Sequence, residues 1–170
     1  MSAFLYWLRL GLAAFLAFAP PSLRVDGGVI VANLEAEHML TQEMRELVAG
    51  GVPLSFELYC SAKADSGELS ARRVRRSIGY DYLRRSYRIE EEGRSSREAA
   101  SLGEAEKILK RFDSLSLDLG AGWKRASLFV ELRCLGDPLL EKRFGVDGAS
   151  LWGGYRPSIR LDVANAVAPR

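Results

Sequence analysis

The sequence has few of the residues that usually carry catalysis or bind metals. His38 is the single histidine among 170 residues, so a metal site built from several imidazoles is excluded. There is no Cys-x-x-Cys pair, no Gly-Lys-Ser/Thr phosphate loop, no Gly-x-Ser-x-Gly turn and no Ser-x-x-Lys pair. A Ser-His-Asp triad would depend on His38, which we expect at an exposed position beside a helix. The sequence predicts no cofactor or metal and gives catalysis no support, although two carboxylates could still meet in space.

A strong charge of either sign is also absent. The 24 Lys and Arg residues nearly balance the 22 Asp and Glu residues, for a formal net charge of +2. The net charge of the whole chain therefore does not indicate a nucleic-acid-binding protein. Hydrophobic residues make up 48% of the chain, which excludes global disorder, and the length fits one folded domain.

The first 19 residues differ from the rest by their apolar character. Residues 10–19 form an unbroken apolar run, with Arg9 before it and the small-x-small triplet Ala17-Phe18-Ala19 at its end. This layout is typical of a secretory signal peptide, so we expect a signal peptide or an uncleaved anchor helix over 1–19. Pro20 would follow the cleavage site and hinder the peptidase. The chain is therefore expected in the periplasm or attached to the outer face of the cytoplasmic membrane.

Beyond the apolar segment we expect a linker at 20–28, one β-rich domain over 29–164 and a tail over 165–170. Alternating apolar and polar residues indicate half-buried strands. They occur at 29–37, 52–60, 115–119, 126–134 and 159–163, and in a long segment over 71–89. The apolar parity of the long segment changes at Tyr82–Leu83, which predicts a β-bulge or a sharp bend.

Helical spacing of apolar residues predicts two helices. One covers 40–49 with Thr41 as its N-cap, and the other begins at the capping box Ser101–Glu104. A one-turn helix over 137–144 is also expected, and the strands on either side of 120–122 are expected to form a hairpin. The predicted fold class is mainly β with two helices (α+β), a sandwich-like antiparallel sheet domain preceded by an N-terminal hydrophobic signal or anchor helix. A closed sandwich and a curved sheet packed on helices both fit the pattern.

Arginines are concentrated in the segment over 71–89, where only Asp81 opposes them. One interpretation is an anion-binding or partner-binding face with tyrosines as stacking partners. The other is pairing with the acidic stretch over 26–71 across neighbouring strands, since surface charges usually neutralise locally. The candidate anion- or partner-binding residues are Arg72, Arg73, Arg75, Arg76, Arg84, Arg85 and Arg88, and the candidate aromatic contacts among them are Tyr80, Tyr82 and Tyr87.

Two further features each have a functional and a structural interpretation. Cys60 and Cys134 fall on the apolar parity of their strands, so they form a disulfide if those strands are neighbours or otherwise stay two buried thiols. Trp152 and Tyr155 lie in a Gly-rich loop over 148–157. Exposed, both are candidate aromatic contacts for a partner or a membrane; folded back, Trp152 would close one end of the core.

The order of several short motifs is similar to that of one exported bacterial family. The motifs are Gly51-Val52-Pro53-Leu54-Ser55-Phe56 at the start of a strand, the segment from Tyr80 to Ile89, Ser101-Leu102-Gly103-Glu104-Ala105 at the start of a helix, and a late Leu-rich hairpin. From Val29 to Val163 they resemble the family known as domain of unknown function 4390. The resemblance implies a signal-bearing envelope protein with no assigned activity and no catalytic residues to carry over. Relatives encoded near membrane sensor kinases suggest an envelope signalling accessory.

These observations favour a non-catalytic envelope domain that binds a partner protein or an anionic membrane component. Nucleic acid is not an expected partner, because an exported protein seldom meets it. A second hypothesis is a lipid or apolar-ligand carrier in which the sandwich opens to hold an acyl chain. A third is a hydrolase with an unrecognised carboxylate site, which would need two close acids in a pocket.

Overall fold

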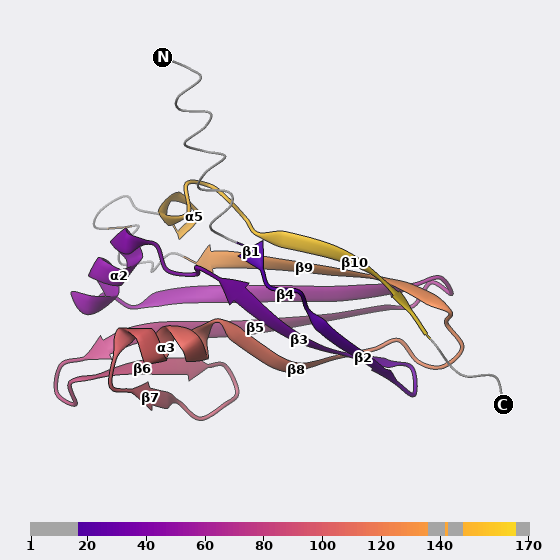
Figure 1. Ribbon diagram of the computed structural model, residues 1–170, viewed down its shortest axis with the longest axis horizontal. Helices are drawn as coiled ribbons and strands as arrows, with labels where there is room; N and C mark the ends of the chain where they lie inside the picture. Colours follow the sequence, from indigo (N-terminus) through magenta and orange to yellow (C-terminus); the bar gives the residue numbers. More distant parts are fainter. Residues whose placement is uncertain (1–16, 136–141, 143–147, 166–170) are drawn as a thin grey trace, which may run out of the picture.

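The computed structural model describes residues 17–135, 142 and 148–165. Two antiparallel sheets enclose the core, and the helices gather at one end of them (Figure 1). The expected mainly β, α+β fold is confirmed. The apolar run before residue 17, the expected one-turn helix over 137–144 apart from residue 142, and most of the tail lie outside the described residues. Among the helices of these ranges, none has the length and apolar character that crossing a membrane requires.

The larger sheet has six strands in the order β10-β9-β4-β5-β6-β7. They are β4 (Leu54–Ala64), β5 (Leu69–Asp81), β6 (Ser86–Glu91), β7 (Arg97–Ala99), β9 (Arg125–Leu135) and β10 (Ser158–Ala164). Because successive side chains of a strand point to opposite faces, Phe56, Leu58 and Cys60 of β4 enter the core. Glu57 and Tyr59 lie on the other face, which we call the outer face.

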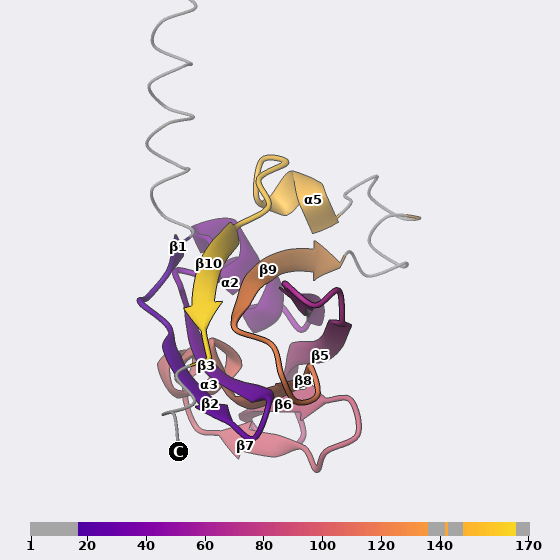
Figure 2. The same cartoon turned by 90° about the vertical axis from the view of Figure 1, so that its right-hand side faces the viewer.

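The smaller sheet is built on β3 (Val29–Glu37), which pairs with β8 (Arg111–Asp118) on one side and with β2 (Ser22–Asp26) and β1 (Ala17–Phe18) on the other. Seen from the end, β9 and β10 lie on one side of the core and β2 and β3 on the other (Figure 2). The expected linker over 20–28 is therefore wrong for residues 22–26. These residues form β2, and its Leu23 and Val25 pack against the core.

Gly28 is needed where the chain turns from β2 into β3. Its φ is 94°, in the left-handed region, and a Cβ there would clash with the backbone oxygen of Gly120. The Gly28 oxygen accepts hydrogen bonds from the amide of Leu119 (3.2 Å) and from the indole of Trp123 (3.1 Å). This contact holds the crossover from β8 to β9, which belong to different sheets. The hairpin expected around 120–122 is thus wrong, because β8 pairs with β3 and β9 pairs with β4 and β10.

The two expected helices are present as α2 (Gln42–Ala49) and α3 (Leu102–Leu109), and α5 (Gly148–Leu151) adds one turn. Thr41 caps α2 as expected, since its hydroxyl accepts from the amide of Met44 (3.2 Å). Ser101 caps α3 in the same way, accepting from the amide of Glu104 (3.3 Å). The Glu104 carboxylate accepts from the amide of Ala100 (3.1 Å), one residue before the position that a standard capping box uses.

The segment over 71–89 is two strands and not one bent strand. β5 and β6 pair antiparallel around a turn at 82–85, so the change in apolar parity marks a reversal of the chain. The Asp81 carboxylate holds this turn by accepting from the amides of Leu83 (2.9 Å) and Arg84 (3.1 Å). Arg85 adopts a φ of 52°. No turn was predicted here, because residues 82–85 contain neither Gly nor Pro.

Trp152 closes one end of the core. Only 2% of the residue is exposed, its indole donates to the backbone oxygen of Met39 (3.0 Å), and its ring lies 5.6 Å from that of Phe56. A buried indole offers no area to a partner, so the structural interpretation of Trp152 is the one that the fold supports. Tyr155 stays at the surface, with 37% of it exposed.

Cys60 and Cys134 lie on neighbouring strands but are not bonded to each other. The register of β4 and β9 places Cys60 opposite Val130 and Cys134 opposite Phe56. An offset of four residues is about 13 Å along a strand, whereas a disulfide needs Cα atoms within about 7 Å. The possible disulfide is therefore wrong, and the alternative of two cysteines buried in the core is the one that the structure supports.

We expect the Cys60 thiol to be inert in the folded protein. Burial raises its pKa to about 11, and only 1% of the residue is exposed. At pH 8 roughly one thiol in a thousand is then ionised, and the thiolate is the reactive form. In a Cys134→Ala variant, iodoacetamide should label Cys60 only as fast as the protein unfolds, and urea should accelerate labelling strongly. Labelling of the native protein at the rate of a free thiol would contradict this expectation.

Candidate functional site

The seven candidate arginines do not form one surface. The β4–β5 register places Arg75 opposite Glu57 on the outer face and Arg76 opposite the core residue Phe56. Alternation along the strands then divides the others. Arg73 and Arg88 lie on the outer face, Arg72 has the parity of Arg76, and Arg84 and Arg85 belong to the turn.

Arg76 is the most buried of the seven, with 3% of its side chain exposed. Its Nε donates to Glu91 of β6 (2.7 Å), and its Nη1 donates to the backbone oxygens of Leu109 (3.0 Å) and Arg111, where α3 ends and β8 begins. The guanidinium also lies 4.3 Å from the ring centroid of Phe112. A cation at the carboxyl end of a helix is stabilised by the helix dipole. Arg76 therefore ties α3 to the larger sheet, and its role is structural.

Several exposed arginines are neutralised by acids on a neighbouring strand or on the same strand. Arg75 donates through Nε to Glu57 (2.9 Å), and this hydrogen bond together with the Glu57 charge raises the pKa of Arg75. Next to it on the outer face, Arg133 bonds Glu131 (2.6 Å) and lowers the pKa of that carboxyl. Further ion pairs join Arg84 to Glu98 and Arg88 to Glu90.

The remaining arginines have weaker contacts. The Arg73 guanidinium lies 5.8 Å from the ring centroid of Tyr59, and Arg72 donates to the hydroxyl of Ser116 (3.1 Å). Within the described ranges, Arg85 makes no ion pair.

Of the ion pairs that this cluster makes, the one from Arg75 to Glu57 uses the acidic stretch over 26–71, as the structural interpretation expected. Arg76, Arg84 and Arg88 pair instead with Glu91, Glu98 and Glu90, which follow the cluster in the chain. The outer face is a surface of mixed charge.

The turn between β5 and β6 carries Leu83, the most exposed large apolar side chain among the described residues. We define the hairpin tip as residues Tyr82–Arg85. Leu83 is 96% exposed and Tyr82 is 61% exposed. The ring centroids of Tyr82 and Tyr80 lie 5.0 Å apart, and the two rings meet edge-on. The ring centroid of Tyr87 also lies 5.0 Å from that of Tyr80. The three candidate tyrosines therefore form one cluster that holds the hairpin tip in place.

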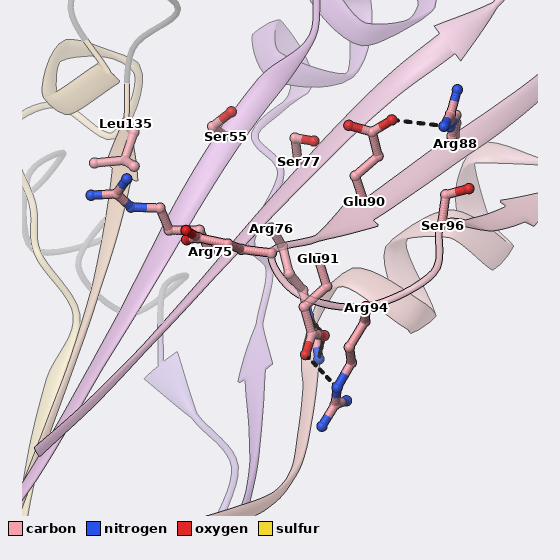
Figure 3. Close-up of a pocket in the computed structure, with 11 residues that line it drawn as sticks. Ser55, Arg75, Arg76, Ser77, Arg88, Glu90, Glu91, Arg94, Ser96 and Leu135 are labelled. Carbon is pink, nitrogen blue, oxygen red and sulfur yellow. Dashed lines mark hydrogen bonds and ion pairs between the residues drawn. The ribbon is translucent and has the colours of Figure 1, made fainter.

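Two hollows open along β5 and β6, and the second of them reaches the hairpin tip. The first, of about 590 Å³, crosses β4, β5 and β6, where Figure 3 shows Ser55, Ser77 and Glu90 side by side and Arg88 directed at Glu90. The second, of about 470 Å³, shares Ser77, Arg88 and Glu90 with the first and is bounded by the hairpin tip itself. Its other walls are more apolar and include Pro53, Gly79 and Tyr80. We call the hairpin tip and these two hollows the tip surface.

Most acids that line the tip surface are paired with arginines. Asp81, Glu90 and Glu91 each form an ion pair, with Arg84, Arg88 and Arg94 respectively. Glu92 also lines the first hollow. In the part of the chain that the structure describes, no group of three or more His, Cys, Asp or Glu side chains could hold a metal ion. What the surface offers is hydroxyl and charged hydrogen-bonding groups around an exposed apolar tip. That combination matches the composition of protein interfaces.

Sequence reasoning found part of this surface. The predicted candidates include five of its arginines and two of its tyrosines, namely Arg75, Arg76, Arg84, Arg85, Arg88, Tyr80 and Tyr82. Leu83, Pro53 and Gly79 were not candidates. Leu83 was assigned to a strand, where an apolar residue is ordinary. Once residues 82–85 are known to be a turn, a leucine between a tyrosine and two arginines becomes the clearest signal of the site.

Replacing Arg76 with Ala should lower the free energy of unfolding by about 3–5 kcal/mol, because Glu91 and the α3 carbonyls would lose a buried partner. The matched control is Arg88→Ala, since Arg88 and Glu90 are 48% and 55% exposed and such a pair contributes at most about 1 kcal/mol. Urea unfolding followed by circular dichroism measures both losses. Equal, small losses would show that Arg76 is not the link described above.

Comparison with known proteins agrees with the resemblance seen in the motifs. The family model described as Domain of unknown function (DUF4390) matches residues 16–137, which include every strand from β1 to β9 and the whole hairpin tip. No curated protein and no solved structure gives a significant match. With most of its length covered by that model, the chain belongs to the DUF4390 family.

Proposed function

We propose that this chain is an exported, non-catalytic domain that binds a protein partner in the bacterial envelope through its tip surface. The observation that carries the proposal is the hairpin tip, where Leu83 is 96% exposed and Tyr82 is 61% exposed. Export rests on the apolar segment over 1–19, which has the layout of a signal sequence.

Order at the hairpin tip supports a binding role. Asp81 fixes the turn through two backbone amides, and the Tyr80 ring packs edge-on against the Tyr82 ring. A side chain displayed on a fixed turn loses little freedom when it meets a partner, so more of its contact energy becomes affinity. Tyrosine and arginine are also among the residues that protein interfaces favour.

Charge balance favours a protein over an anionic membrane. Arg84 and Arg88 are already paired with Glu98 and Glu90, which leaves Arg85 as the cation of the hairpin tip without an acid. Each basic residue near an anionic bilayer contributes about 1 kcal/mol, so one unpaired arginine gives weak attraction. A protein surface can instead match the alternating charges of the two hollows as well as the apolar tip.

The carrier and hydrolase hypotheses have less support. Side chains of the larger sheet that face the smaller one, such as Leu54, Leu58 and Leu132, are fully buried, and the hollows described above open on the outer surface. A bound acyl chain would have to displace packed core. Ion pairing of Glu90 and Glu91 favours a role in surface complementarity over proton transfer.

Leu83→Ser should abolish partner binding, whereas Leu69→Ser should not. Leu69 is 68% exposed and begins the same strand β5, about 40 Å from the hairpin tip at about 3.3 Å per residue, so it is a matched control. A photo-crosslinking residue at position 83 of the full-length chain, in its own or a related bacterium, should join it to one envelope protein. For that protein, truncating a central contact should weaken binding by at least about 30-fold, which corresponds to about 2 kcal/mol.

Two results would contradict the proposal. One is crosslinking from position 69 that equals or exceeds that from position 83. The other is loss of anionic vesicle binding in Leu83→Ser without any protein crosslink, which would assign the hairpin tip to the membrane surface.

A further inference from the structure

The signal-like triplet Ala17-Phe18-Ala19 is part of the folded domain. β1 pairs antiparallel with the end of β3, with Ala17 opposite Glu37 and Phe18 opposite Ala36. The ladder continues one residue further, because the amide of Ala19 donates to the backbone oxygen of Glu35 (2.9 Å).

Phe18 anchors this short strand. Its side chain is half-buried and packs against the core, and β1 also lies beside β10 of the larger sheet. On the opposite edge of β3, the amide of Ala36 donates to the backbone oxygen of Lys110 (2.9 Å). Both edges of β3 are therefore occupied near Ala36. If residues 17–19 were removed, one of these edges would lose its hydrogen-bond partners and the Phe18 site would open to water.

A signal peptidase must read the small-x-small triplet just before its cleavage point. Residues 17–19 cannot lie in the peptidase and in the β3 ladder at the same time. We propose that docking of β1 shields Ala17-Phe18-Ala19 from cleavage after Ala19, so that the exported domain keeps residues 1–16 as its membrane tether. This proposal rests on export, and it does not depend on what the tip surface binds.

Tethering through β1 would hold the domain close to the membrane. Residues 17–19 enter the sheet directly, and β2 begins at Ser22. The last three residues of the apolar run are thus already part of the sheet. A chain held in this way meets partners that project only a short distance from the bilayer.

Pro20 offers a second reason for poor cleavage, so the test must separate it from β1. Pro20 is exposed and its replacement by Ala should leave the fold intact. The Pro20→Ala variant of the full-length chain should keep its N-terminus because β1 still docks. Adding Phe18→Ser removes the anchor of β1 while leaving both small residues of the triplet in place. The double variant should then lose residues 1–19.

The measurement is the intact mass and N-terminal sequence of each variant, isolated from the envelope fraction of a bacterium that exports it. Ser22→Ala in the Pro20→Ala background is the control, because Ser22 is exposed on β2. A periplasmic reporter enzyme fused to the C-terminus shows whether each variant is translocated. Release of residues 1–19 should also lower the melting temperature of the domain by roughly 5 °C or more, as the loss of one edge strand implies.

Three results would overturn the proposal. Complete removal of residues 1–19 from the translocated Pro20→Ala chain would show that β1 does not shield the triplet. Equal retention in Pro20→Ala and in the double variant would show that something other than Phe18 docking prevents cleavage. An inactive reporter fusion would show that the chain is not exported. That result would also contradict the part of the proposed function that places the domain in the envelope.

Discussion

The buried guanidinium of Arg76 is the interaction on which the arrangement of the two sheets depends. It joins β5 to β6 through Glu91 and receives the end of α3 through backbone carbonyls. Because β8 follows α3 directly, this contact fixes where the chain passes from the larger sheet, through α3, into β8 of the smaller sheet. It also fixes β6 against β5, and the hairpin tip is the turn between those two strands. One charged side chain thus positions both the crossover between sheets and the surface proposed to bind.

Local structure was largely readable from the sequence, and pairing was not. Alternation identified β3, β4, β9 and β10, and the hydroxyls of Thr41 and Ser101 identified the starts of both helices. These signals lie within a few residues of each other. The pairing of β8 with β3 and of β9 with β4 depends on which apolar faces meet across long separations, and periodicity carries no such information. The disulfide failed for the same reason, since it required the β4–β9 register.

The candidate site was half predicted. The arginines are close together in the sequence, but in the structure they are divided over two strands and two faces of the sheet. This division was not predicted, because the turn between the strands contains neither Gly nor Pro. Its neutralising acids come from separate segments, with Glu57 on β4, Glu91 on β6 and Glu98 on β7. Only the total charge of the acidic stretch before it suggested pairing. The exposure of Leu83 follows from the turn, and it could not be inferred while that residue was assigned to a strand.

The strands that close the N-terminal corner are neighbours in sequence as well as in space. β1, β2 and β3 fall within residues 17–37, whereas β3 meets β8 and β4 meets β9 only across loops of many tens of residues. Closing a short loop costs less chain entropy than closing a long one. Low contact order therefore favours early formation of this three-stranded corner, as it does of the β4–β5 and β5–β6 hairpins, before β8 reaches β3 and β9 reaches β4. The end of the chain that leads into its apolar segment would thus be among the first parts to fold.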